Sequence, residues 1–343
     1  MIANFKNTYN YNYINMCITQ KLKKMKKIRT NLNIKKYRKM IIMPDDEDIT
    51  YFTGNHDHTD RSFNDHNNKK REHIITHMSD INEDYTSHLK YGEDWKKLQT
   101  GFDAKMKDIC PSYCSYKIEH KAGRNFKYDY LISFLDEHKN KIATKKVEFK
   151  FNVATIDAAP QFVSPMNPSR FMTTSFEEYY YDNYLVNLLQ KFGFEVPERS
   201  LYLKTVNQTT PKCMETAQQL YYQGASKKSS SKYTGTIESL TFCNNCKKIS
   251  KECISNFISN NELNIEVMNQ YLIEGQANKI YLLYKNGEFN IQTMTPDDYT
   301  IASYSKNPKK SRFEAITKTN KKMNLLLRWK NGNGIAMTAF QIS

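Results

Sequence analysis

The stretch KKVEFKFN, residues 145–152, alternates apolar and polar side chains. In a β-strand, successive side chains point to opposite faces of the sheet, so residues two apart share a face. Glu148 and Lys150 would then lie together on the polar face. A solvated face with a weak surface ion pair explains this pattern, and so does a catalytic site. The predicted apolar face consists of Val147, Phe149 and Phe151.

Length and charge set the first limits. The chain has 343 residues, enough for one large domain or two ordinary ones, and its 24 Tyr and 18 Phe can fill a sizeable core. The net charge is +15, but residues 1–44 hold eleven Lys and Arg and no acid, so residues 45–343 carry only 15 − 11 = +4. Charge alone therefore does not identify the globular part as a nucleic-acid-binding protein.

We interpret residues 1–44 as a basic, disordered N-terminal arm. It could form a helix on an anionic surface, act as a localisation signal, or be an annotation artefact if translation begins at Met40 or Met43. The seven cysteines form no dense framework, which is typical of a reducing compartment. Neither a membrane-spanning run nor a signal segment is evident, so we expect a soluble, intracellular protein with no membrane partner.

The order of elements predicts an α/β protein. Residues 45–83 are polar and are expected to be a linker, mostly loop or disorder. Residues 84–205 are expected to form the core, in the order helix, strand, strand, strand, helix. The predicted segments are a helix at 84–109, strands within 114–120, 127–136 and 145–151, a helix at 175–193 capped by Ser175, and a further strand at 200–206.

The segment 206–343 is expected to be a C-terminal α+β extension of the same domain. It carries helical patterns at 212–223 and within 250–275, separated by a polar link. Two hairpins are expected near the end, one through Asn286-Gly287 and one through the Asn-Gly repeats that follow Trp329.

Asp129 distinguishes the triplet at residues 148–150 from the other acid-x-Lys triplets of the chain. Glu-x-Lys or Asp-x-Lys occurs five times, so the triplet alone means little. Only Glu148–Lys150 lies in a well-patterned strand that follows an Asp-bearing strand, nineteen residues after Asp129. If the two strands pair as a hairpin, Asp129 and Glu148 converge on one face of the sheet.

Asp129 followed by Glu148-Phe149-Lys150, in this order of elements, resembles the PD-(D/E)xK nuclease superfamily. The resemblance implies a restriction-endonuclease-like core, a mixed central sheet flanked by helices. Tyr128 stands where the family motif has proline. The C-terminal LLRWKNGNGIAMTAFQIS also resembles the ends of nuclease-like proteins of large DNA viruses, which implies a place in the host cytoplasm, the nucleus or the virion.

The resemblance implies a Mg²⁺- or Mn²⁺-dependent nuclease acting on DNA, with RNA left open. Asp129 and Glu148 would be the metal ligands, joined by the backbone carbonyl of Phe149, because Mg²⁺ prefers oxygen ligands. Lys150 would orient or activate water and stabilise the transition state. Gln161 would support the site, and Glu93 on the first helix would add an acid. The sequence leaves the oligomeric state open, a homodimer included.

Other signals are weaker. The runner-up function is a non-catalytic nucleic-acid-binding or virion-associated protein that uses the basic arm. The Tyr-rich segment 177–185 favours a helix core over base stacking, and the RWKNGNG segment suits a plain hairpin as well as phosphate contacts by Arg328 and Lys330. We expect free thiols rather than a zinc site at Cys110, Cys114, Cys243, Cys246 and Cys253. We likewise expect a polar, disordered segment rather than a metal site at His56, His58, His66, His73 and His77.

Deletion of residues 1–44 tests the role of the arm. Because its cations have no counter-acid, we expect the deletion to weaken DNA binding and to flatten the dependence of affinity on salt. The measurement is the slope of log affinity against log salt concentration for the full chain and the truncated chain. An unchanged affinity and slope would remove the arm from DNA binding.

Overall fold

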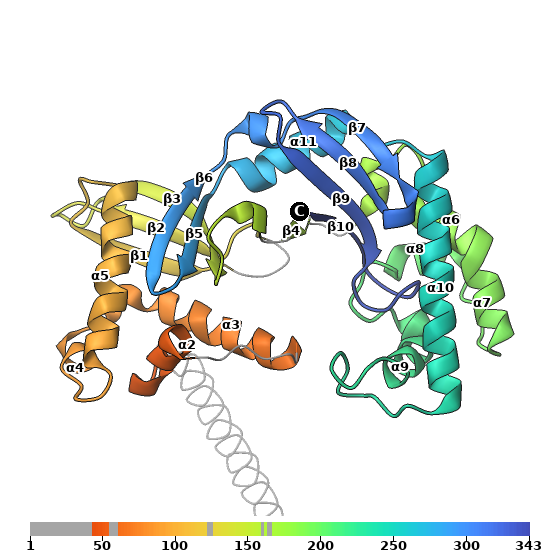
Figure 1. The fold of residues 1–343 in the computed structure, drawn as a ribbon, viewed down its shortest axis with the longest axis horizontal. Coiled ribbons are helices and arrows are strands. Elements are labelled where there is room, and N and C mark those ends of the chain that lie inside the picture. Colours follow the sequence, from red (N-terminus) through yellow and green to blue (C-terminus); the bar gives the residue numbers. More distant parts are fainter. Residues whose placement is uncertain (1–42, 55–60, 122–125, 159–160, 163–166) are drawn as a thin grey trace, which may run out of the picture. The chain divides into compact units, whose positions relative to one another are not determined.

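The computed structural model describes residues 43–54, 61–121, 126–158, 161–162 and 167–343. All but the last two residues of the predicted arm lie outside these ranges. Asp46–Ser343 forms one compact unit, built from two five-stranded sheets and the helices around them. The protein is thus a mixed α/β protein, as predicted (Figure 1).

The first sheet is mixed. Its strand order is β1-β2-β3-β5-β6, and every neighbouring pair is antiparallel except β3 and β5, which run parallel. The three predicted strands of residues 114–151 are confirmed, whereas the parallel pairing with β5 was not predicted. The bounds are β1 Ser115–His120, β2 Tyr130–Leu135, β3 Lys141–Phe151, β5 Ile280–Lys285 and β6 Glu288–Thr293.

The predicted apolar face of β3 is buried beneath a helix. The helix α5 (Gly92–Ile109) packs across the first sheet, and its Trp95 and Phe102 are fully buried (Figure 1). Val147 and Phe149 of β3 belong to the same core. The alternation in KKVEFKFN therefore separates an apolar face from a polar one, as expected for a strand with one buried side.

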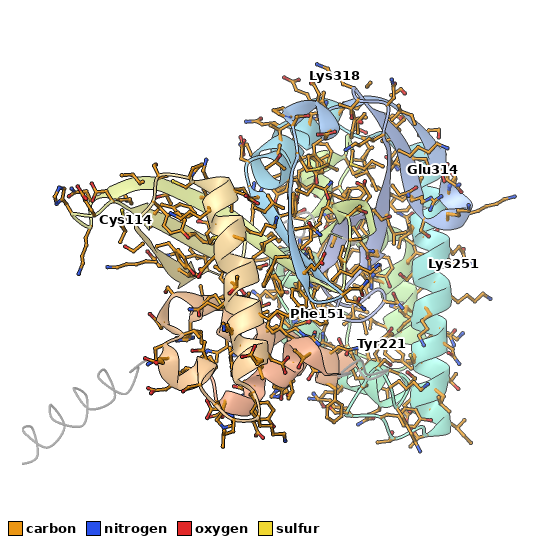
Figure 2. The ribbon with its side chains drawn as sticks, turned by 60° about the vertical axis from the view of Figure 1, so that its left-hand side comes forward. Cys114, Phe151, Tyr221, Lys251, Glu314 and Lys318 are labelled. Atoms are coloured by element: carbon orange, nitrogen blue, oxygen red, sulfur yellow. The ribbon has the colours of Figure 1, made fainter. Side chains whose placement is uncertain are left out.

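The prediction of loop or disorder for residues 45–83 is wrong where the structure describes them. The helix α3 (Arg61–Thr76) packs on the first sheet, and Ile74 is fully buried. Phe151 lies at the end of β3 (Figure 2). The Arg71 guanidinium lies 3.5 Å from the centre of the Phe151 ring. Long polar side chains that cover apolar surface explain why composition misled the prediction. The shorter elements are Asp46–Ile49, α2 Thr50–Thr53, Met78–Asp80 and α4 Glu83–Thr86.

The second sheet is antiparallel throughout, in the order β4-β10-β9-β8-β7. Its strands are β4 Gln161–Phe162, β7 Ile301–Asn307, β8 Arg312–Thr317, β9 Lys322–Trp329 and β10 Thr338–Ile342. The surrounding helices are α6 Phe176–Tyr180, α7 Val186–Lys191, α8 Arg199–Thr205, α9 Glu215–Gln223, α10 Ile237–Asn260 and α11 Ile265–Leu272. None of the helices in the described ranges is long and apolar enough to cross a membrane.

Several local predictions are confirmed and one is wrong. The Ser175 hydroxyl caps α6 by accepting from the Glu178 amide, and the hairpin between β5 and β6 turns through Asn286 and Gly287, both with positive φ. The hairpin between β9 and β10 is also present. The expected strand at 200–206 is instead the helix α8, because Tyr202 and Val206, four residues apart, bury one helical face.

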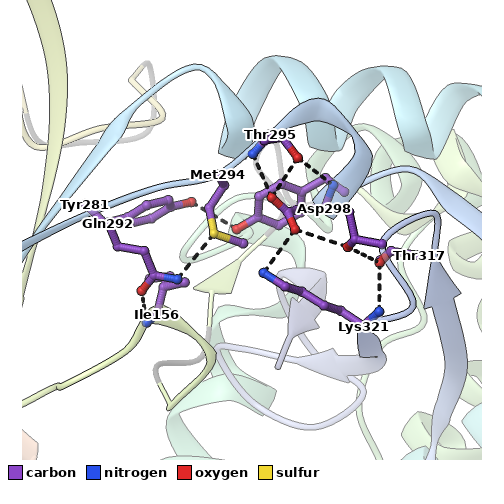
Figure 3. A network of polar contacts seen from close by, with 10 residues as sticks. Ile156, Tyr281, Gln292, Met294, Thr295, Asp298, Thr317 and Lys321 are labelled. Atoms are coloured by element: carbon purple, nitrogen blue, oxygen red, sulfur yellow. Dashed lines mark hydrogen bonds and ion pairs between the residues drawn. The ribbon is translucent and has the colours of Figure 1, made fainter.

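A polar network lies where β5 and β6 reach the second core (Figure 3). The Tyr281 hydroxyl on β5 donates to the Gln276 carbonyl at 3.0 Å, and the Gln292 side chain on β6 accepts from the Ile156 amide at 2.8 Å. Burial opposes ionisation of Asp298, but the Thr295 amide and the Lys321 ammonium hold its pKa well below the usual range. These bonds tie the end of the first sheet to loops of the second.

Ile74→Ala tests whether α3 belongs to the folded core. The substitution removes a fully buried side chain, so we expect a loss of about 2–5 kcal/mol in the free energy of unfolding. The matched control is Ile237→Ala, whose side chain is 86% exposed and whose loss should stay within about 0.5 kcal/mol. Chemical denaturation measures both, and equal effects would contradict a core role for α3.

Candidate active site

Asp129 lies directly before β2 and is bonded to β3 on both sides of Glu148. Its backbone amide donates to the Val147 carbonyl at 3.0 Å. Its Oδ2 accepts from the Phe149 amide at 2.9 Å. The predicted hairpin therefore exists, and it brings Asp129 and Glu148 to the same point of the first sheet.

Glu148 is held between two lysines. Its Oε1 lies 2.5 Å from the Lys150 ammonium, and its Oε2 forms an ion pair with Lys279. Lys279 also donates to the carbonyl of Lys127 at 2.7 Å. The side chains are 12% exposed for Glu148, 24% for Lys150 and 3% for Lys279, so Lys150 is the member most open to solvent.

The sequence did not predict that Lys279 belongs to the site. It reaches the site through the parallel pairing of β3 with β5, two strands that are far apart in the sequence. In that register Val147 lies opposite Ile280, which places the residue before β5 beside the polar face of β3. A π-helical turn, Ile273–Ala277, delivers the chain to this position. The signal in the sequence is the apolar run that follows Lys279, which indicates a strand buried on both faces.

The charges of the site are unevenly balanced. Burial, together with repulsion from Glu148, raises the pKa of Asp129 to about 6, although the Phe149 amide works against this shift. Burial also opposes ionisation of Glu148, but Lys150 and Lys279 outweigh it and lower its pKa. Burial lowers the pKa of Lys279 despite the attraction of Glu148. Among the ion pairs of the described residues none includes Asp129, so its charge is the least compensated.

A second acid lies near Asp129. Glu72 on α3 pairs with His120 at the end of β1 at 3.1 Å, and its carbonyl accepts from the Tyr130 hydroxyl at 3.2 Å. The hydrogen bond to Glu72 raises the pKa of His120, and the charge of Glu72 contributes to the raised pKa of Asp129. This pair was not predicted, because the polar composition of residues 45–83 favours a linker.

Two further residues that the resemblance implied belong to other elements of the fold. Glu93 is an exposed residue in the first turn of α5, and Glu72 is the helical acid whose charge acts on Asp129. Gln161 lies in β4, where its backbone pairs with Ile342 of the second sheet. Asp129, Glu148 and Lys150 are brought together, whereas the backbone of Gln161 belongs to a different sheet.

Among the described residues, the cysteines considered for zinc lie in different cores. Cys243 and Cys246 are buried in the second core on α10, whereas Cys110 is buried in the first. The ring centres of His73, on α3, and His77, just after it, lie 4.5 Å apart, and His56 and His58 lie outside the described residues. In the part of the chain that the structure describes, no group of three or more His, Cys, Asp or Glu side chains could hold a metal ion.

The donors of the Asp129–Glu148 site fit a hard divalent cation. Two carboxylates offer the oxygen donors that such an ion prefers, and Mg²⁺ is commonly held by one or two carboxylates with water and substrate phosphate completing its shell. The mutual repulsion of Asp129 and Glu148 in a buried place would also be relieved by a cation.

Comparison with known proteins assigns no family. No family model matches the chain, and no curated protein is significantly similar to it. Any function must therefore be argued from the geometry of Asp129, Glu148, Lys150 and Lys279.

Asp129→Asn should stabilise the metal-free protein at neutral pH. The folded pKa is about 6, against about 4 in the unfolded chain, so the contribution of Asp129 to the free energy of unfolding falls as pH rises from about 4 to about 6. Asn removes the charge and keeps an acceptor for the Phe149 amide. We expect a gain of about 1–3 kcal/mol at pH 7.5 that shrinks toward pH 4.

Chemical denaturation in the presence of a chelator measures this effect at both pH values. The matched control is Asp108→Asn, whose carboxylate is 61% exposed and pairs with Lys105. That variant should differ from wild type by less than about 0.5 kcal/mol at either pH. An Asp129→Asn protein that is less stable than wild type at pH 7.5 would contradict the charge balance described above.

Proposed function

We propose that the protein is a metal-dependent nuclease that hydrolyses DNA phosphodiester bonds on a restriction-endonuclease-like core. One observation carries the proposal: the Asp129 carboxylate accepts from the Phe149 amide, which fastens it to the Glu148–Lys150 segment. Two acids and a lysine thus meet on the polar face of a mixed sheet whose other face is covered by α5.

The charges of this site are compatible with binding a divalent cation and, through it, a phosphate group. When all four groups are ionised, Asp129 and Glu148 contribute −2, while Lys150 and Lys279 contribute +2, so the set is neutral. A bound Mg²⁺ or Mn²⁺ would supply charge neutralisation of the phosphate and a lower pKa for a bound water. Asp129 and Glu148 would hold that ion, with the Phe149 carbonyl as a further oxygen ligand.

The two lysines have different positions and therefore different roles. Lys150 is the more exposed, so its ammonium can reach an attacking water or the oxygens of a phosphate, where it stabilises developing negative charge. Lys279 is buried and is also bonded to the Lys127 carbonyl, so it fixes the orientation of Glu148. Lys150 would be the catalytic residue and Lys279 a positioning residue.

The rival function is a non-catalytic nucleic-acid-binding or virion-associated protein with a nuclease-like fold. The partial burial of the Asp129 carboxylate argues against a purely structural role for the site, because it lowers the stability of the fold. A surface ion pair contributes about 0–1 kcal/mol, and a partly buried carboxylate with a raised pKa, such as Asp129, costs stability. Residues that cost stability are common where function requires them.

Substitution of the two strand residues tests the proposal. Glu148→Gln should weaken metal binding and cleavage together, because it removes a charged oxygen ligand. Lys150→Met keeps most of the side-chain length but removes the ammonium. It should bind DNA nearly as wild type and cleave about 10²–10³-fold more slowly. The measurement is single-turnover cleavage of plasmid, linear and single-stranded DNA, and of RNA, with Mg²⁺ titrated into each folded variant.

The matched controls are Glu137→Gln and Lys139→Met, the same triplet in the exposed turn between β2 and β3. Both should cleave like wild type. Wild-type cleavage by Lys150→Met would contradict the proposed mechanism. A wild-type protein that binds DNA but cleaves no substrate with Mg²⁺ or Mn²⁺ would favour the rival function.

A further inference from the structure

A pocket of about 450 Å³ opens beside the ion pair of Glu148 and Lys279. Lys279 forms part of its wall, and Tyr128 is the chain neighbour of Asp129. The remaining side chains that matter for recognition are Phe126, Lys127, Lys146 and Glu274. The pocket therefore adjoins the candidate active site through side chains that are in contact with it or next to it in sequence.

The pocket is positively charged. Three lysines and a single acid line it, and Lys146 precedes Glu148 by two residues on β3, so the two share a face of the sheet. Lys127 is partly buried, with its ammonium 3.8 Å from the centre of the Tyr271 ring, and its stem packs against Gly275. A Cβ at position 275 would lie 3.1 Å from the Lys127 stem, so a larger residue there would require Lys127 to shift slightly.

Aromatic rings accompany these lysines. The Phe126 side chain is 41% exposed, which is unusual for a phenylalanine, and its ring lies 5.6 Å from that of Tyr128. The Lys146 ammonium lies 5.6 Å from the centre of the Tyr128 ring. Exposed aromatic rings beside cations are the features with which proteins bind single-stranded nucleic acid, through base stacking and phosphate contacts.

We propose that this pocket binds one unpaired nucleotide of the substrate strand, next to the bond that is cut. The inference rests on the proposed nuclease function. Lys127 and Lys146 would contact the phosphate, and Phe126 would stack on the base, with Tyr128 beside it. In a duplex both faces of a base are covered by its neighbours, so only a single-stranded or frayed strand can present a base to Phe126. The preferred substrate is therefore DNA with unpaired nucleotides.

Binding measured without cleavage tests the pocket. The full chain in EDTA is titrated with fluorescent single-stranded DNA and with a blunt duplex of the same sequence. Phe126→Ala should raise the Kd for the single strand roughly 5- to 100-fold, the range for loss of one stacked base, and leave the Kd for the duplex unchanged. Phe126→Trp should restore single-strand binding, whereas Phe126→Leu, which lacks a π face, should not.

The lysine contact has a matched control on the neighbouring residue. Lys146→Gln should lower the salt slope of single-strand binding by about 0.7, the value for one phosphate contact. Lys145 lies on the opposite face of β3 because side chains alternate, so Lys145→Gln should leave that slope unchanged. Equal effects of Lys145→Gln and Lys146→Gln would overturn the phosphate contact.

Two results would overturn the pocket as a nucleotide site: wild-type binding by Phe126→Ala, or an equal loss for single strand and duplex. Cleavage of the same two DNAs by the wild type with Mg²⁺ separates this proposal from the nuclease proposal. Single-strand binding that depends on Phe126, in a protein that cleaves none of the DNA and RNA substrates with Mg²⁺ or Mn²⁺, would support the nucleotide site and overturn the nuclease function.

Discussion

The parallel pairing of β3 with β5 is the interaction on which the rest of the structure depends. It joins strands that are far apart in the sequence, and it makes the first sheet mixed. Along β5, Leu282 packs into the first core while Leu283 packs into the second, so one strand serves both hydrophobic cores. The same register places Lys279 against Glu148. A shift of one residue would exchange the two faces of β5 and remove Lys279 from the site.

The candidate site holds two carboxylates close together, and their mutual repulsion is unfavourable for folding. Asp129 and Glu148 repel each other in a region that is largely closed to water, and the two lysines neutralise Glu148 far better than Asp129. Glu72 adds a further negative charge nearby. Burial of like charges is unfavourable for stability unless a cation or a substrate interaction compensates. A divalent cation bound between Asp129 and Glu148, as proposed, would relieve this imbalance.

Local patterns in the sequence predicted local structure well. The alternation of Val147, Glu148, Phe149 and Lys150 predicted a strand with one buried face. Pairing of the two successive strands as a hairpin was expected to bring Asp129 and Glu148 together, and it does. Non-local contacts could not be predicted in this way. Lys279 reaches the site only through a parallel pairing, which leaves no periodic signal near Lys279 itself. The polar composition of α3 concealed Ile74 and Glu72, because a narrow apolar stripe suffices when long polar side chains cover the rest.

We propose that Asp129 and Glu148 are placed to share a divalent cation. The most direct test is anomalous diffraction from crystals of the wild-type protein grown with Mn²⁺. An ion shared by the two carboxylates would give an anomalous peak about 2.0–2.3 Å from an oxygen of each. One of the two lysine ammonium groups would then leave the Glu148 oxygen that binds the ion. Crystals in saturating Mn²⁺ that show no peak there, with both lysines still paired to Glu148, would contradict the shared site.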